Sequence, residues 1–139
     1  MAFRKDVKVE LLRRIPLFSK CSKRELGLIA MLADEMNIPA GTAFIREGER
    51  GREFVAIVEG TVEVRRNGRK IDLKGGADFF GEMSLLSGAP RNATVTATSP
   101  VRAFVVTDTA FSTLLHESPG LQAKLMSALA ERVAQTEPV

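Results

Sequence analysis

An acidic and a basic side chain, Glu82 and Arg91, stand at either side of a short glycine-containing stretch within residues 79–95 (FFGEMSLLSGAPRNATV). Gly81 permits a tight turn or the close approach of a ligand, and the backbone N–H groups of a helical turn over residues 82–86 would attract an anion. A guanidinium holds a phosphate through two parallel hydrogen bonds, whereas a carboxylate suits a sugar hydroxyl. The pair therefore fits a ligand with both ribose and phosphate. The alternative is a surface acid and base beside a loop.

Side chains for covalent chemistry are scarce in this chain. His116 and Cys21 are the single histidine and the single cysteine of the 139 residues, so neither a nucleophile paired with histidine nor a transition-metal site is expected. We predict that the protein is not an enzyme and holds no metal. We expect His116 to lie near a helix end and Cys21 to be inert.

The charge balance is mildly basic, with 20 Lys and Arg against 17 Asp and Glu and a net charge of +3. The basic residues are spread along the chain, which is weak support for nucleic-acid binding. The charged start lacks the apolar core of a secretory signal, and no apolar run approaches the roughly 20 residues that cross a bilayer. We therefore predict a soluble cytoplasmic protein with neither a nucleic-acid nor a membrane partner.

The elements that must position residues 79–95 begin with two helices. Apolar residues recur at helical spacing from Val7 to Ile15, before Pro16 interrupts the pattern. Ser22 and Glu25 have the spacing of a capping box at the start of a second helix. We expect this second helix to end near residue 36.

The middle of the chain changes to a period of two, which predicts strands. Val62 and Val64 alternate with polar neighbours, the small residues over 93–97 do the same, and residues 101–107 (VRAFVVT) are mostly apolar. The predicted turns lie at Glu59-Gly60, Asn67-Gly68 and Gly75-Gly76. Many short strands divided by turns are typical of a compact barrel or sandwich.

The last part of the chain returns to helical spacing. We expect Asp108 to cap a helix that carries Phe111, and Pro119 to begin the last helix. The apolar stripe of that last helix is Leu121, Leu125, Leu129 and Val133, widened by Met126. The prediction is a single α+β domain with helical residues 7–36, β-rich residues 37–107 and C-terminal helices over residues 108–135.

Residues 80–95 (FGEMSLLSGAPRNATV) closely resemble the phosphate-binding cassette of the cyclic nucleotide-binding domain family. Residues 15–26 (IPLFSKCSKREL) resemble its N-terminal helical segment, and residues 38–64 (IPAGTAFIREGERGREFVAIVEGTVEV) its early strands. The resemblance implies an eight-stranded antiparallel β-roll, similar to a jelly roll. N-terminal helices, a short cassette helix and C-terminal lid helices would accompany the roll.

Residue by residue, the resemblance implies a site for cAMP or cGMP and no further cofactor. Glu82 would accept from the ribose 2′-hydroxyl, with the amide of Gly81 beside the ribose. Arg91 would pair with the cyclic phosphate, and Asn92 and the amide of Ala93 would complete the phosphate cradle.

The base would lie against other elements. Val62 and Val64 would form an apolar wall, although both are also ordinary core candidates. Arg132 resembles the arginine by which the last helix of some bacterial channels caps the base. The alternative is an arginine whose charged end reaches solvent.

We predict a bacterial-type sensor that binds cAMP in preference to cGMP and signals through its C-terminal helix to an unidentified downstream protein. The alternatives are a ligand-free interaction module, or a fragment of a larger transcription regulator or channel. The initial Met1 and the absence of an apolar lead-in favour a complete small protein.

Overall fold

The computed structural model describes residues 4–76, 78–81 and 88–132. The helices that it describes are α1 (Lys5–Arg13), the 3-10 turn η1 (Pro16–Phe18), α2 (Lys23–Leu32), α4 (Asp108–Glu117) and α5 (Pro119–Arg132). The strands are β1 (Asp34–Ile38), β2 (Ala43–Ile45), β3 (Glu53–Glu59), β4 (Thr61–Arg66), β5 (Arg69–Gly75), β6 (Phe79–Phe80), β7 (Thr94–Ala97) and β8 (Val101–Thr107).

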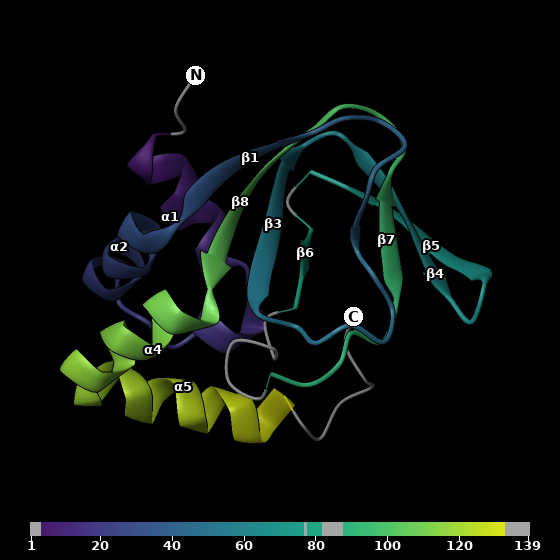
Figure 1. Cartoon of the computed structure of the whole chain (residues 1–139). Helices are drawn as coiled ribbons and strands as arrows, with labels where there is room; N and C mark the ends of the chain where they lie inside the picture. The colour runs from purple at the N-terminus through teal and green to yellow at the C-terminus, as the bar shows by residue number, and fades with distance from the viewer. Residues whose placement is uncertain (1–3, 77, 82–87, 133–139) are drawn as a thin grey trace.

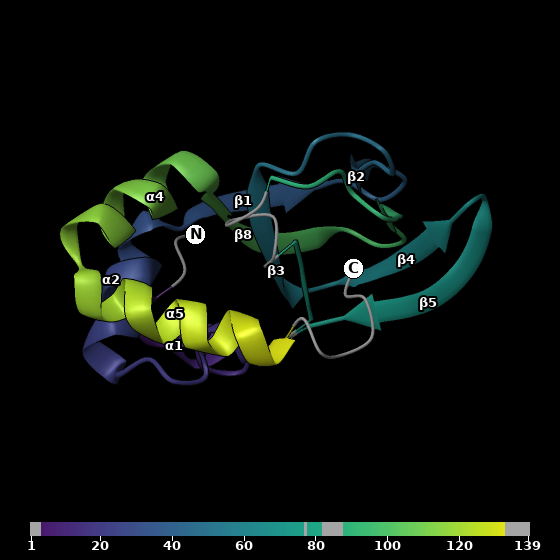
Figure 2. The ribbon, with the colours of Figure 1, turned by 90° about the horizontal axis from the view of Figure 1, so that it is seen from below.

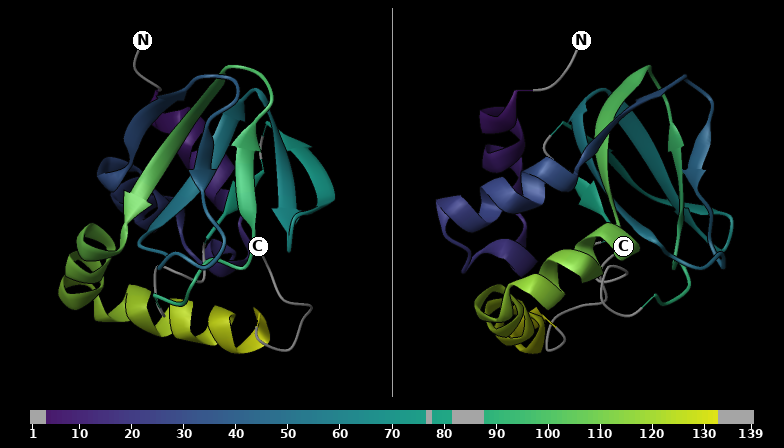
Figure 3. Two further views of the ribbon diagram at one scale, coloured as in Figure 1. Left: turned by 45° about the vertical axis from the view of Figure 1, so that its right-hand side comes forward. Right: turned by 60° about the vertical axis from the view of Figure 1, so that its left-hand side comes forward.

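The strands form two antiparallel four-stranded sheets, in the orders β1-β8-β3-β6 and β2-β7-β4-β5. Figure 1 shows the two sheets facing each other as a roll, with α1 and α2 beside the first sheet and α4 and α5 at its lower end. The view from below and the two further views agree that the helices lie on one side of the roll (Figures 2 and 3). This arrangement confirms the predicted α+β β-roll.

Strand β3 separates two hydrophobic cores. Phe54 and Ala56 pack with the helices, whereas Val55 and Ile57 point into the roll. Successive side chains of a strand point to opposite faces, so a strand buried on both faces is apolar at every position rather than alternating. The run FVAIV within β3 meets this requirement.

Two local predictions are confirmed in detail. The Ser22 N–H donates to Glu25 Oε1 at 2.8 Å, and the Glu25 N–H donates to Ser22 Oγ at 3.1 Å, which completes the capping box of α2. Asn67 and Gly68 have φ of 53° and 77° in the turn between β4 and β5. Positive φ at both central residues is the requirement of the tight hairpin turn that this pair favours.

The predicted end of the second helix was wrong. Helix α2 ends at Leu32, and residues Asp34–Ile38 form β1, which pairs with β8 from Asp34↔Val105 to Ile38↔Val101. Strand β1 (DEMNI) is largely polar, so its own sequence gives no clear period of two. Pairing with β8 decides its conformation, and the β-region begins at residue 34 instead of 37.

The first helix also ends earlier than its apolar pattern suggested. Helix α1 stops at Arg13, and Ile15 lies in the turn before η1. Ile15 is nevertheless only 1% exposed, because the turn carries it into the core between the helices and the first sheet.

Two C-terminal predictions need correction. Thr107, not Asp108, caps α4, because its Oγ1 accepts the Ala110 N–H at 3.3 Å. Met126 is 53% exposed and does not widen the buried face of α5, which consists of Leu121, Leu125 and Ala128. One residue along a helix is a rotation of about 100°, so Met126 points away when Leu125 points inward. The side chain of Leu129, and Val133, lie outside the described residues.

None of the described helices is long and apolar enough to span a membrane.

Candidate functional site

Gly81 and Arg91 meet at the end of β6. Gly81 follows Phe80 with a φ of +81°, a conformation that favours glycine. A Cβ atom at this position would lie 2.0 Å from Arg91 Nη1 and 2.9 Å from the Glu53 carbonyl oxygen. Any larger residue at position 81 would therefore displace the Arg91 guanidinium.

The Arg91 side chain is buried, with 9% of the residue exposed. Its Nη2 donates to the Glu53 carbonyl at 2.5 Å. Its backbone is held as well, because the Arg91 N–H donates to the Glu49 carbonyl at 2.7 Å and its carbonyl accepts the Gly48 N–H at 2.8 Å. The guanidinium is thus fixed between the start of β3 and the end of β6, and the loop that precedes β3 holds the Arg91 backbone.

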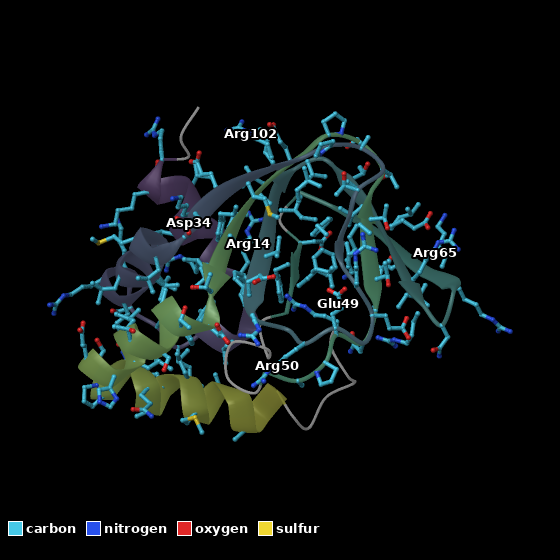
Figure 4. The ribbon with its side chains drawn as sticks, in the orientation of Figure 1. Arg14, Asp34, Glu49, Arg50, Arg65 and Arg102 are labelled. Carbon is cyan, nitrogen blue, oxygen red and sulfur yellow. The ribbon has the colours of Figure 1, made fainter. Side chains whose placement is uncertain are left out.

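The loop that holds Arg91 lies at the lower end of the roll, where Figure 4 labels Glu49 and Arg50. Arg50 pairs with Pro90 in an isolated bridge, and the Gly51 N–H donates to the Ala89 carbonyl at 3.1 Å. These bonds tie the segment after residue 87 to the loop that precedes β3.

Burial lowers the pKa of Arg91 from its ordinary value, and the nearby Glu53 carboxylate partly opposes this effect. Arginine keeps its charge at physiological pH despite such a shift. A cation that is shielded from water interacts more strongly with an anion than an exposed one does. The end of the roll is therefore a favourable place for a negatively charged ligand group.

Asn92 and Ala93 follow Arg91 directly and lead into β7. The Asn92 carbonyl accepts from Arg66 Nε at 2.8 Å, and Asn92 itself is half-buried. Ala93 is 1% exposed and belongs to the core inside the roll. The structure thus brings Gly81, Arg91, Asn92 and Ala93 to one end of the roll.

Val62 and Val64 are fully buried inside the same roll. They pair with Ala97 and Val95 of β7 and share a core with Phe80 of the opposite sheet. The residue after Phe80 is Gly81, so the apolar interior is continuous with the Arg91 end. Both readings of the two valines, core and ligand wall, are compatible with this position.

Two predicted site residues lie outside what the structure describes. Glu82 and the rest of the expected helical turn fall within residues 82–87, and the side chain of Arg132 at the end of α5 is likewise outside the described part. Their roles remain predictions.

The residues considered for covalent chemistry lie elsewhere. Cys21 has its pKa raised to about 11, chiefly by burial and then by the neighbouring Glu25. The thiol therefore stays protonated at neutral pH, which disfavours it as a nucleophile. His116 is exposed in the last turn of α4, and the described part of the chain contains no group of three metal-ligating side chains.

Sequence reasoning missed two contributors to this site, Glu53 and Arg66. Glu53 acts on Arg91 through its main-chain carbonyl, and a carbonyl carries no signal in the residue type. Arg66 is one of a pair of arginines at the end of β4. Only the folded chain shows that this second arginine meets Asn92.

A buried arginine at one end of a β-roll with an apolar interior is an arrangement that suits a small anionic ligand. The family model of the cyclic nucleotide-binding domain matches residues 35–118. The chain therefore belongs to the cyclic nucleotide-binding domain family, as its cassette predicted.

Relatives with this domain have different overall functions. A cyclic nucleotide-gated potassium channel of Rhizobium etli is 35% identical over 123 residues, which cover 88% of this chain and 34% of the channel. A cAMP-dependent protein kinase regulatory subunit of Mycosarcoma maydis is 40% identical, over 81% of this chain and 23% of the subunit. The chain thus spans about a third or less of these two relatives.

Solved structures share the fold. The N-terminal domain of a transcriptional regulator from Streptomyces coelicolor A3(2) has a TM-score of 0.81 and 27% identity, with 89% of this chain and 92% of that chain covered. The regulatory domain of Toxoplasma gondii PKA, solved with cAMP, has a TM-score of 0.72 and 30% identity, over 78% of this chain and 43% of that chain.

Proposed function

We propose that this chain is a sensor that binds a cyclic nucleotide monophosphate, cAMP in preference to cGMP. The observation that carries the proposal is the buried Arg91 guanidinium, held against Gly81 at the end of an apolar roll. A cyclic nucleotide has one anionic end and one flat, largely apolar end. This site offers a buried cation followed by an apolar interior, in the same order.

Each predicted residue has a role in this proposal. Arg91 pairs with the cyclic phosphate, and Asn92 and the Ala93 amide complete its cradle. Glu82 and the Gly81 amide hold the ribose. Three further residues contact the base: Val62, Val64 and Arg132.

The preference for cAMP rests on position 92. In the family, Thr or Ser directly after the cassette arginine favours cGMP by bonding its guanine. Asn92 is longer than either, so that geometry does not carry over. Several relatives named for cAMP also support this choice, among them the kinase subunit of Mycosarcoma maydis and a CRP-like cAMP-activated regulator of Mycobacterium tuberculosis.

The proposed sensor is a cytoplasmic, bacterial-type regulatory protein without catalytic activity or a cofactor. Binding is passed through α5 to a downstream protein that the sequence does not name. The chain matches only part of the length of these relatives, and the alternative is a sensor fragment of a larger transcription regulator or channel.

Isothermal titration of the purified protein with cAMP and cGMP in parallel tests the proposal. We expect one-to-one binding, with cAMP at least as tight as cGMP. An absence of heat and of amide chemical-shift changes with both nucleotides at millimolar concentration would reject the receptor and favour the ligand-free module. A preference for cGMP of tenfold or more corresponds to about 1.4 kcal/mol of binding free energy. If such a preference is found and Asn92→Ala reverts it, the proposed preference for cAMP is rejected and the receptor function is retained.

A further inference from the structure

Arg66 is the last residue of β4 and lies in the sheet opposite to the one that contains Glu53. Its neighbours on alternate positions of β4, Val62 and Val64, are fully buried in the interior. Since alternate side chains of a strand share a face, Arg66 points to the same face and is half-buried. An arginine placed on the inner face of a strand needs a polar partner.

That partner is the main chain directly after Arg91. Arg66 Nε donates to the Asn92 carbonyl at 2.8 Å, across 26 residues of sequence. The adjoining turn adds a second link, because the Asn67 N–H donates to Glu47 Oε1 at 2.9 Å. The end of the β4–β5 hairpin is thus bound both to the segment that directly follows Arg91 and to the loop before β3.

The bond to the Asn92 carbonyl sets the direction of the next amide. No cis peptide bond occurs among the described residues, and in a planar trans peptide the C=O and N–H groups point in opposite directions. With the Asn92 carbonyl turned to Arg66 Nε, the Ala93 N–H points away from the Arg66 guanidinium. A main-chain donor held in a fixed direction loses less freedom when it binds an anion.

We propose that Arg66 is a positioning residue for the phosphate end of the nucleotide, because it holds the Asn92–Ala93 peptide in the orientation that presents the Ala93 N–H. This inference rests on the proposed function and adds a residue from a distant strand to the cassette. Arg91 supplies the charge that pairs with the phosphate. Arg66 holds the Asn92–Ala93 peptide so that its N–H is oriented toward the same phosphate.

Three variants separate this role from simple packing. Arg66→Met keeps the apolar stem and removes the donor. Arg66→Lys keeps a donor at the end of the stem. The matched control is Arg65→Ala, since Arg65 is the neighbouring arginine, lies on the outer side of the roll (Figure 4) and contacts Glu63 and the Gly68 carbonyl instead.

The measurements are the Kd for cAMP by titration calorimetry and the amide spectrum of the free protein. We expect Arg66→Met to weaken cAMP binding about tenfold or more, in line with the loss of a hydrogen bond from a charged donor, and to shift the Ala93 amide resonance. Arg66→Lys should recover most of the affinity, and Arg65→Ala should bind within about twofold of wild type.

The outcomes are distinguishable. If wild type binds neither nucleotide, the proposed function fails and this inference fails with it. If wild type binds cAMP and Arg66→Met binds it equally well, the inference alone is overturned, because the apolar part of the side chain is then sufficient for binding without the hydrogen bond. Equal losses in Arg66→Met and Arg66→Lys would also overturn it, since a retained donor would then have no value.

Discussion

Replacing Arg91 with alanine removes the one side chain on which the proposed site depends most. Only 9% of Arg91 is exposed, so a phosphate beside its guanidinium is largely shielded from water. Loss of one partner of such a buried charge pair typically costs about 2–5 kcal/mol of binding free energy. The expected loss of cAMP affinity is therefore about 30-fold to several thousand-fold.

The same substitution should change folding stability little. It removes the hydrogen bond to the Glu53 carbonyl, which contributes about 1.5–3 kcal/mol for a charged donor. It also removes a charge whose burial is itself unfavourable, as the lowered pKa of Arg91 indicates. The two effects have opposite signs, so the net change in the free energy of unfolding should be small compared with the change in binding.

Calorimetric titration with cAMP and urea unfolding of the free protein measure the two quantities separately. Arg102→Ala is the matched control, because Arg102 is a partly exposed arginine of β8 that pairs with Glu59 at 3.0 Å, at the end of the roll away from Glu49 (Figure 4). If Arg91→Ala binds cAMP as tightly as Arg102→Ala does, the phosphate binds elsewhere and the reasoning is refuted.

Three further predictions concern other parts of the molecule. Gly81→Ala should weaken cAMP binding strongly in the wild-type background and much less in the Arg91→Ala background, because the new Cβ meets the guanidinium; additive effects in calorimetry would contradict the contact. Lys124→Met should lower the free energy of unfolding by about 0.2–1 kcal/mol at neutral pH, because Lys124 Nζ lies 2.5 Å from Glu25 Oε1. That difference, measured by urea unfolding, should shrink as the pH falls below the ordinary pKa of a glutamate carboxylate, because the Lys124 hydrogen bond, followed by those of Ser22, lowers the pKa of Glu25 in the folded protein. A difference that stays constant with pH would exclude the ion pair. Deletion of residues 130–139 should weaken cAMP binding while the roll stays folded, and cAMP should slow amide exchange in α5; unchanged affinity and exchange would mean that α5 is only a scaffold.

Local sequence was sufficient to predict the elements whose hydrogen bonds and backbone conformations depend only on neighbouring residues. The capping box of Ser22 and Glu25 and the Asn67-Gly68 hairpin need only residues within one turn, and both form as predicted. The alternation around Val62 and Val64 was equally readable, because one face of β4 is buried and the other is not. The cassette sequence is also sufficient by itself to identify the family.

The tertiary structure decided what depends on distant partners. Residues Asp34–Ile38 form strand β1 because β8 pairs with them, although the sequence predicted that the preceding helix continues to about residue 36. The approach of Arg91 to Gly81 and Glu53, and of Arg66 to Asn92, joins segments that lie up to 38 residues apart. Residue types indicate which groups are able to bind a phosphate, but only the closing of the roll places an arginine, a glycine and two main-chain carbonyls at one end of it.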